Sequence, residues 1–194
     1  ISRCLRGDRP SHKGWTFVES ADRGLGFTTP VDQIAQLLHD IQTSPNSRRL
    51  LVNMWNPSEA RQVALPPCHT LYQVKCYEDT KEISLHLFAR SIDIFLGLPY
   101  NIASYAFLLN MLGFATGYTP LELGISFSDL HLYNNHVDQA KEQLSREPYL
   151  LPTVSIAEEA RLATPLETLL NIKWEHITLN GYKHHPKIEA PVAV

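Results

Sequence analysis

The sequence predicts an α+β fold in which a mixed or antiparallel sheet packs against one long buried helix. Residues 83–89 alternate between apolar and polar side chains, which is the period of a strand with one buried face. Residues 49–55 and 70–77 are short apolar runs of strand length. Residues 102–116 are almost wholly apolar over the length of a helix, and such a helix is buried.

The composition of the 194-residue chain fits one globular unit, with 44% hydrophobic and 19% charged residues. A formal net charge of −3 gives no general attraction to nucleic acid or to an anionic membrane. No run approaches the roughly 18 apolar residues that a membrane span needs. The three cysteines, Cys4, Cys68 and Cys76, form neither a zinc-type pair nor an even disulfide set. We therefore expect a cytoplasmic protein with no bound metal.

The chain is expected to divide near residue 27. Residues 1–27 begin with a basic, turn-rich stretch, in which ISRCLRG…SHKGWTF resembles the end of the short DNA-binding repeats attached to homing endonucleases. A solvated basic linker and a remnant nucleic-acid module both remain open for this piece. Residues 28–194 have the patterns of a compact unit of helices and strands.

The first helix is expected from about residue 30 to residue 43. Thr29 can cap it, Pro30 suits its first position, and Ser44-Pro45 ends it. One face is apolar: Val31, Ile34, Leu37, Leu38 and Ile41.

The second helix, 102–116, is expected to end at Gly117. Its apolar positions include Ile102, Tyr105, Ala106, Leu109, Met111 and Leu112. A third, amphipathic helix is expected over 132–146, and a final strand over 174–180.

Cys68 and His69 lie side by side just before the strand 70–77. Such a junction places side chains at the edge of a cleft, and a thiol becomes a nucleophile when positive charge lies near it. Arg48, Arg49 and Arg90 are candidate cations on strands of the same sheet. A buried structural cysteine is the alternative reading of Cys68.

Arg48 and Arg49 form a pair that could clamp a phosphate, since guanidinium groups bind phosphate oxygens in a planar fork. Neighbouring strand residues point to opposite faces, so both could not serve one site of the same subunit. Surface ion pairs are the alternative reading.

Two further segments carry polar groups among apolar neighbours. In the run 90–101, Arg90, Ser91, Asp93 and Asn101 require polar partners, which a ligand or a turn could supply. Asn101 offers the donor and acceptor that the N3–H and O4 edge of uracil needs. His131 and Tyr133 could bind a sugar hydroxyl or cap a helix, while His136, His184 and His185 are expected to be surface or satisfied histidines.

In order and spacing, several strings resemble the thymidylate synthase family over about residues 28–194. They are SRRLLVNMWNP, ALPPCH, ARSIDIFLGLPYNIASYAFLL, SDLHLYNNHVDQ with LSREP, and GYKHHPKIEAPVAV. The resemblance implies a homodimer that joins sheet to sheet and converts dUMP to dTMP with 5,10-methylenetetrahydrofolate as co-substrate.

By this resemblance, Cys68 is the nucleophile that adds to C6 of dUMP, and Arg48 and Arg49 reach the nucleotide of the partner subunit. The implied nucleotide site consists of Arg48, Arg49, His69, Arg90, Ser91, Ile92, Asp93, Asn101, His131, Leu132 and Tyr133. The implied folate site consists of Asp93, Leu96, Gly97, Tyr100 and Ala193. The C-terminal residues would close over both ligands and exclude water.

The sequence also departs from the family pattern. Ile92 stands where the family usually has cysteine, Ala89 where glutamine is frequent, and Phe127-Ser128 where paired glycines precede Asp129. No counterpart is visible for the upstream segment that carries the family's general-base glutamate. Hydroxymethylation of dUMP on the same fold, or an inactive or split fragment of a thymidylate synthase, therefore remain alternatives.

Overall fold

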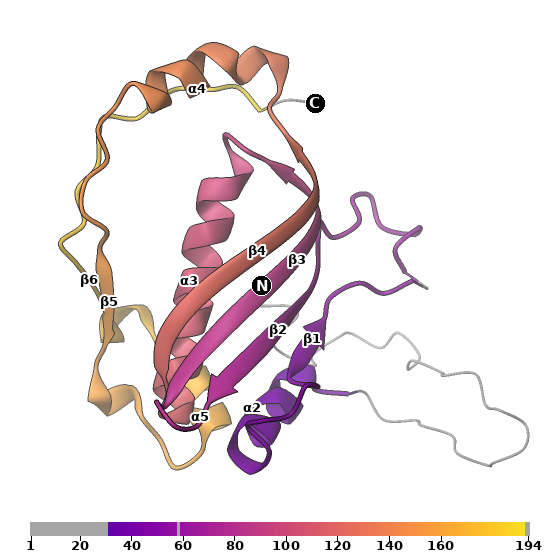
Figure 1. Cartoon of the computed structure of the whole chain (residues 1–194), viewed down its shortest axis with the longest axis vertical. Helices are drawn as coiled ribbons and strands as arrows, with labels where there is room; N and C mark the ends of the chain where they lie inside the picture. The colour runs from indigo at the N-terminus through magenta and orange to yellow at the C-terminus, as the bar shows by residue number, and fades with distance from the viewer. Residues whose placement is uncertain (1–30, 58, 193–194) are drawn as a thin grey trace, which may run out of the picture.

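A four-stranded mixed sheet organises the part of the chain that the computed structural model describes, residues 31–57 and 59–192 (Figure 1). The strand order is β1-β2-β3-β4, from Leu51–Asn53, His69–Tyr77, Glu82–Asp93 and Thr119–His131. The pairs β1/β2 and β2/β3 are antiparallel, whereas β3 and β4 are parallel. Both this mixed sheet and the α+β class agree with the expectation from the sequence. The predicted first strand is shorter than 49–55, because only three of its residues pair with β2.

The helix α3, Gly97–Thr116, connects the two parallel strands and lies along one face of the sheet (Figure 1). It begins five residues before the predicted Ile102, and it ends as predicted at Gly117, whose φ of 79° is left-handed. Tyr105, Leu109 and Leu112 are buried against the sheet. Ile102 remains 46% exposed, so the prediction that it is buried was wrong.

The alternation predicted for β3 is confirmed, because Ile83, Leu85, Leu87 and Ala89 are all buried. The first three of them join α3 in a single core. Their neighbours point to the opposite face of the sheet, where Phe88 on β3 and Leu51 on β1 remain partly exposed. No helix among the described residues covers this second face, because α2, α3 and α5 all pack into the one core.

The helix α2, Gln33–Thr43, buries Ile34, Leu37, Leu38 and Ile41 as predicted. Its N-cap is Asp32, whose carboxylate accepts from the backbone N–H groups of Ile34 and Ala35. The predicted start was therefore wrong: Thr29 and Pro30 precede the helix and lie outside the described residues, and Val31 is largely exposed. The helix ends at Ser44, as predicted.

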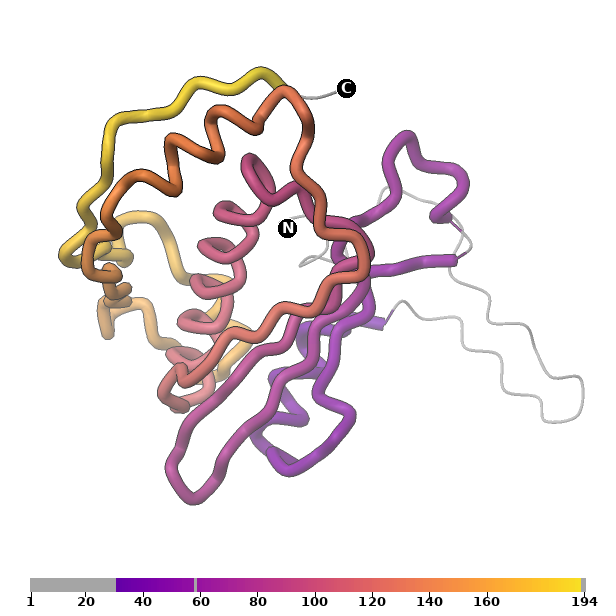
Figure 2. The backbone as a smooth tube through the Cα atoms, turned by 45° about the horizontal axis from the view of Figure 1, so that its top comes forward, coloured from indigo at the N-terminus to yellow at the C-terminus, as the bar shows by residue number. Residues whose placement is uncertain are grey.

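The remaining elements follow β4 along the chain. The predicted helix 132–146 is divided into a 3-10 turn, Asn134–His136, and α4, Val137–Leu144. The predicted last strand is β6, Ile177–Asn180, preceded by the turn Trp174–His176. Figures 1 and 2 show the segment 185–192 running beside α4.

A strand and an α-helix in this part of the chain were not predicted from the sequence. The first is β5, Thr153–Ile156, which pairs with β6 in a second sheet. The second is α5, Pro165–Asn171, which packs against α3. Its start is a capping box, in which the Thr164 hydroxyl and the Glu167 carboxylate each bond to the other residue's backbone N–H. Among the described helices, none is long and apolar enough to cross a membrane.

Candidate functional site

The Cys68 thiol and the Arg90 guanidinium face one another where β2 and β3 pair. Arg90 Nη2 lies 3.8 Å from Cys68 Sγ, and the backbone N–H of Arg90 donates to the Cys68 carbonyl at 2.8 Å. The guanidinium is held in place because its Nε and Nη2 donate to the carbonyls of Pro67 and Pro66, at 3.0 and 2.9 Å. Cys68 is half-buried and in no disulfide. This arrangement holds a fixed cation beside an accessible thiol.

A β-bulge next to the thiol sets the direction of His69. His69 pairs with Ala89, but Leu71 pairs with Phe88, so Thr70 is an extra residue in β2. The His69 Nδ1 lies 3.1 Å from the Tyr105 hydroxyl on α3, and the two rings meet edge to face. Burial lowers the pKa of His69 from 6.5, and a hydrogen bond with the Asn101 side chain opposes this shift. His69 is therefore neutral at pH 7.

Asn101 and Tyr105 are four residues apart on α3, so one face of this helix presents both side chains to His69. The sequence patterns placed Tyr105 on the apolar helix and did not predict it as a site residue. One feature of the sequence could have identified it: Tyr105 brings a hydroxyl into an apolar helix, one turn after Asn101. A buried hydroxyl requires a hydrogen-bond partner. Tyr105 also donates to the Met54 sulfur at 3.6 Å.

Asp93 forms the turn that starts α3. Its two carboxylate oxygens accept from the backbone N–H groups of Phe95 and Leu96, at 3.0 and 3.3 Å. This is the turn-forming role that the sequence left open as the alternative to ligand binding. Gly97 lies close by, since a Cβ added to it would stand 3.4 Å from the Asp93 Cβ and 3.7 Å from the Asn101 Oδ1. Tyr100, on the first turn of α3, is exposed.

The parallel pairing of β3 with β4 brings the polar segment around His131 to the same end of the sheet as Asp93. Ser91 pairs with Asp129, and Asp93 pairs with His131. His131 and Tyr133 meet edge to face, with ring centroids 5.0 Å apart. Two further residues of the predicted nucleotide site differ in burial. Leu132 is partly exposed, whereas Ile92 is buried and points into the protein.

Arg48 and Arg49 do not join this cluster. They lie in the turn between α2 and β1, not on a strand as the sequence predicted, because β1 begins only at Leu51. Both are exposed, and their guanidinium groups make no hydrogen bond or ion pair with any described residue. The argument that the two must point to opposite faces of a strand therefore does not apply. Ala193, predicted at the folate site, lies outside the described residues.

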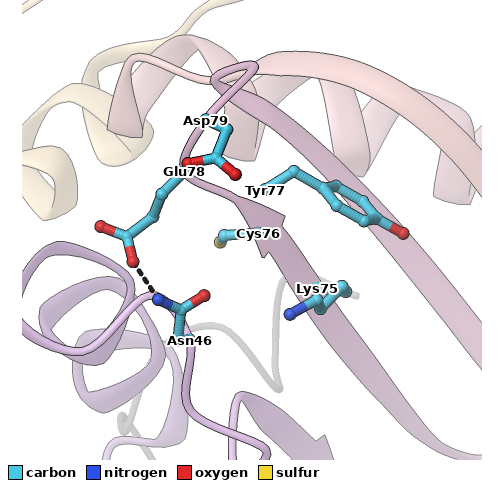
Figure 3. A pocket seen from close by; sticks show the side chains of 6 residues that line it. All are labelled: Asn46, Lys75, Cys76, Tyr77, Glu78 and Asp79. Atoms are coloured by element: carbon cyan, nitrogen blue, oxygen red, sulfur yellow. Dashed lines mark hydrogen bonds between the residues drawn. The ribbon is translucent and has the colours of Figure 1, made fainter.

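A hollow of about 380 Å³ lies at the other end of β2 (Figure 3). It is lined by Asn46, Lys75, Cys76, Tyr77, Glu78 and Asp79, none of which is a predicted site residue. Burial raises the pKa of the Cys76 thiol to about 11, so this cysteine is not a nucleophile at neutral pH. No three histidine, cysteine or acidic side chains among the described residues are grouped as a metal site would require.

His136 was expected to be a surface or satisfied histidine, and it is fully buried. Its Nε2 lies 2.6 Å from the Pro191 carbonyl oxygen. Of the other two, His185 bonds through Nε2 to the Glu147 carbonyl, and His184 bonds through Nδ1 to the His185 carbonyl.

A model of a known protein family matches residues 14–194 of the chain. The matching model is described as thymidylate synthase. The match includes part of the stretch 1–27 that the sequence pattern separated from the rest.

Proposed function

Because this chain belongs to the thymidylate synthase family, we propose that it carries out the reductive methylation of dUMP to dTMP, with Cys68 as the nucleophile. Family membership itself supports a transferase of nucleotide biosynthesis that uses methylenetetrahydrofolate as co-substrate. The observation that carries the finer proposal is the 3.8 Å contact between the Arg90 guanidinium and the Cys68 sulfur. A fixed cation at this distance stabilises the negative charge that a nucleophilic sulfur must carry.

In the proposed reaction, the Cys68 thiolate adds to C6 of the pyrimidine, and the electron pair of the C5–C6 double bond moves to C5. C5 then bonds to the methylene carbon of the folate, and the bond from that carbon to N10 breaks with its electron pair going to N10, so that the carbon remains attached to N5 alone. Loss of the C5 proton to a base expels tetrahydrofolate and leaves an exocyclic methylene group. A hydride from tetrahydrofolate reduces this group to methyl, Cys68 leaves C6, and dihydrofolate is released. We assign the base to none of the described residues.

The neighbours of Cys68 have the chemistry that the nucleotide requires. Arg90 uses Nε and Nη2 on protein carbonyls, so its other N–H groups remain for the phosphate, which Ser91 would share. Asn101, which bonds to neutral His69, would read the uracil edge. His131 and Tyr133 would hold the 3′-hydroxyl of the deoxyribose.

The start of α3 would receive the folate. The Asp93 carboxylate would accept from the pterin, beside Leu96, Gly97 and Tyr100. Asp93 is already held by two backbone N–H groups, which fix the direction of its free lone pairs. The C-terminal segment that contains Ala193 would cover both ligands. Exclusion of water favours a methyl over a hydroxymethyl product.

We propose that the functional unit is a homodimer. Arg48 and Arg49 are exposed and unpaired among the described residues, so they are available to the phosphate bound by a partner subunit. The second face of the sheet is open and carries the partly exposed Phe88 and Leu51. Burying such an apolar face against its own copy is a common route to a two-fold dimer.

The test is an assay of this chain with dUMP and methylenetetrahydrofolate. Dihydrofolate is followed by absorbance, and the nucleotide product is identified by mass spectrometry. Dihydrofolate together with dTMP supports the proposal. Tetrahydrofolate with hydroxymethyl-dUMP would show that the chain is a hydroxymethylase. A folded dimer that binds dUMP without turnover would show that the chain is an incomplete part of an enzyme.

A further inference from the structure

His136 lies beside the predicted nucleotide site without belonging to it. It ends the short turn Asn134–His136, immediately before α4, and its side chain has no exposed surface. Its Nε2 lies 2.6 Å from the Pro191 carbonyl oxygen. A carbonyl only accepts, so Nε2 carries the proton and donates it. Nδ1 then carries no proton and has no hydrogen-bond partner among the described residues.

A buried nitrogen without a partner destabilises a fold, so packing alone does not explain a histidine here. An apolar side chain would fill the same space without this cost. What only the histidine provides is the hydrogen bond to Pro191, from a position 55 residues earlier in the chain.

Among the described residues, it is the only hydrogen bond from α4 and its flanking turns to the C-terminal segment that is made by a fully buried side chain. The other hydrogen bonds to this segment, from α4 and from the turn that follows it, are exposed. They join Gln139 to the Glu189 carbonyl at 3.4 Å and Arg146 to the Pro186 carbonyl at 2.6 Å. Water competes for exposed groups, so these bonds contribute less to holding the segment than the buried one does.

The His136 ring also touches the two segments expected to bind ligands. It packs against Phe95 and Tyr133, with ring centroids 5.5 and 5.9 Å away. The Phe95 backbone N–H donates to the Asp93 carboxylate, and Tyr133 packs on His131. One side chain therefore connects Pro191 to the turn of Asp93 and to the His131 strand end.

We propose that His136 is a positioning residue that sets where the C-terminal segment closes over the site. The inference rests on the proposed function for what the closure does. Ala193 is two residues beyond Pro191, so at about 3.5 Å per residue it lies within about 7 Å of the anchor. Hence Ala193 can meet a ligand only if Pro191 is held near the site.

The experiment compares three substitutions at His136. His136→Leu removes the donor. His136→Asn keeps an amide but is too short to reach Pro191. His136→Gln places an amide nitrogen where Nε2 stood, and Gln139→Ala removes an exposed contact as the control. Backbone hydrogen exchange of residues 186–192 and of α3 is measured by mass spectrometry in the full chain, without ligands and with saturating dUMP and folate.

We expect exchange of residues 186–192 to rise about tenfold in the Leu and Asn variants and to return toward wild type in the Gln variant, while α3 is unchanged. In turnover, KM for the folate should rise about tenfold with the Kd for dUMP within about twofold. Unchanged exchange of the segment, absence of rescue by Gln, or loss of α3 protection in the Leu and Asn variants would each overturn the proposal. The exchange of the ligand-free protein involves no turnover, so failure of the proposed reaction would appear separately.

Discussion

The Arg90 Nη2 lies 3.8 Å from the Cys68 Sγ, and the backbone N–H of Arg90 donates to the Cys68 carbonyl at 2.8 Å. The pairing of β2 with β3 therefore fixes both the thiol and the cation. The Pro66 and Pro67 carbonyls then hold the guanidinium in one orientation. A nucleophile whose cation is supplied by strand pairing needs no rearrangement of the protein before it reacts.

Arg90→Lys should lower kcat/KM for dUMP by about 10²- to 10³-fold. An ammonium group on a flexible chain cannot bond to two carbonyls and also face the sulfur. The measurement is steady-state turnover together with dUMP binding by calorimetry. Arg161→Lys is the matched control, because Arg161 also donates to a carbonyl, that of Phe114, but lies on another element. Equal losses in the two variants would contradict the role of Arg90.

Alkylation of the native protein at pH 8 should modify Cys68 and spare Cys76. Cys76 is fully buried, and its pKa is raised from 9.0 to about 11 by burial, so its thiolate is about a hundredfold scarcer than that of an ordinary thiol. Peptide mass spectrometry after brief iodoacetamide treatment identifies each cysteine, and saturating dUMP should protect Cys68. In urea both should react. Native modification of Cys76 at the rate of Cys68 would disprove this prediction.

Arg48 and Arg49 should act across the subunit interface. A double variant, Arg48→Ala with Arg49→Ala, and the Cys68→Ser variant should each be inactive alone. Refolded together at equal amounts, half the dimers pair one of each subunit, and each of these has one intact site if the arginines act on the partner. The mixture should then recover about a quarter of wild-type turnover. If the arginines serve their own subunit, the mixture stays inactive.

Phe88→Lys should weaken the dimer, because it places a charge on the open face of the sheet. Light scattering after size-exclusion chromatography, over a dilution series, measures the change in mass. Leu144→Lys is the control, since Leu144 is an exposed aliphatic side chain on α4, away from the sheet. A wild-type chain that is monomeric at high concentration, or equal weakening by both variants, would contradict the sheet as the interface.

Local patterns predicted the elements of the core because burial imposes a period on them. The alternation from Ile83 to Ala89 and the apolar face of α2 both appear as expected. The boundaries were less predictable, since they depend on single polar contacts. Asp32 caps α2 in place of Thr29, and the Asp93 carboxylate allows α3 to begin at Gly97.

The contacts of the site required the topology. Nothing in the local sequence says that β3 and β4 are parallel, and only this pairing brings Asp93 beside His131. The bulge at Thr70, which turns His69 toward Tyr105, also has no sequence signature. His136 was expected to be a surface or satisfied histidine, and its partner could not be named from the sequence because the Pro191 carbonyl is 55 residues away.

The burial of His69 should appear in the pH dependence of stability. Its pKa in the folded protein lies below 6.5, mainly because burial disfavours the charged ring, with the Asn101 hydrogen bond acting in the opposite direction. The unfolded chain therefore binds a proton more readily than the folded protein does. The stabilisation from neutral His69 is complete above pH 6.5, and it is lost as the pH falls through the folded pKa.

His69→Gln removes this group, so its free energy of unfolding should depend less steeply on pH below 6.5 than that of the wild type. Urea unfolding at intervals between pH 8 and pH 5 measures both curves, with pH 8 as the reference. His39→Gln, exposed on α2, provides the baseline for exchanging a histidine for an amide. The difference in the free energy of unfolding between wild type and His69→Gln should shrink as the pH falls, because only in the wild type does folding oppose the protonation of a buried imidazole ring. A difference that stays constant, or that grows toward pH 5, would mean that folding does not oppose protonation of His69.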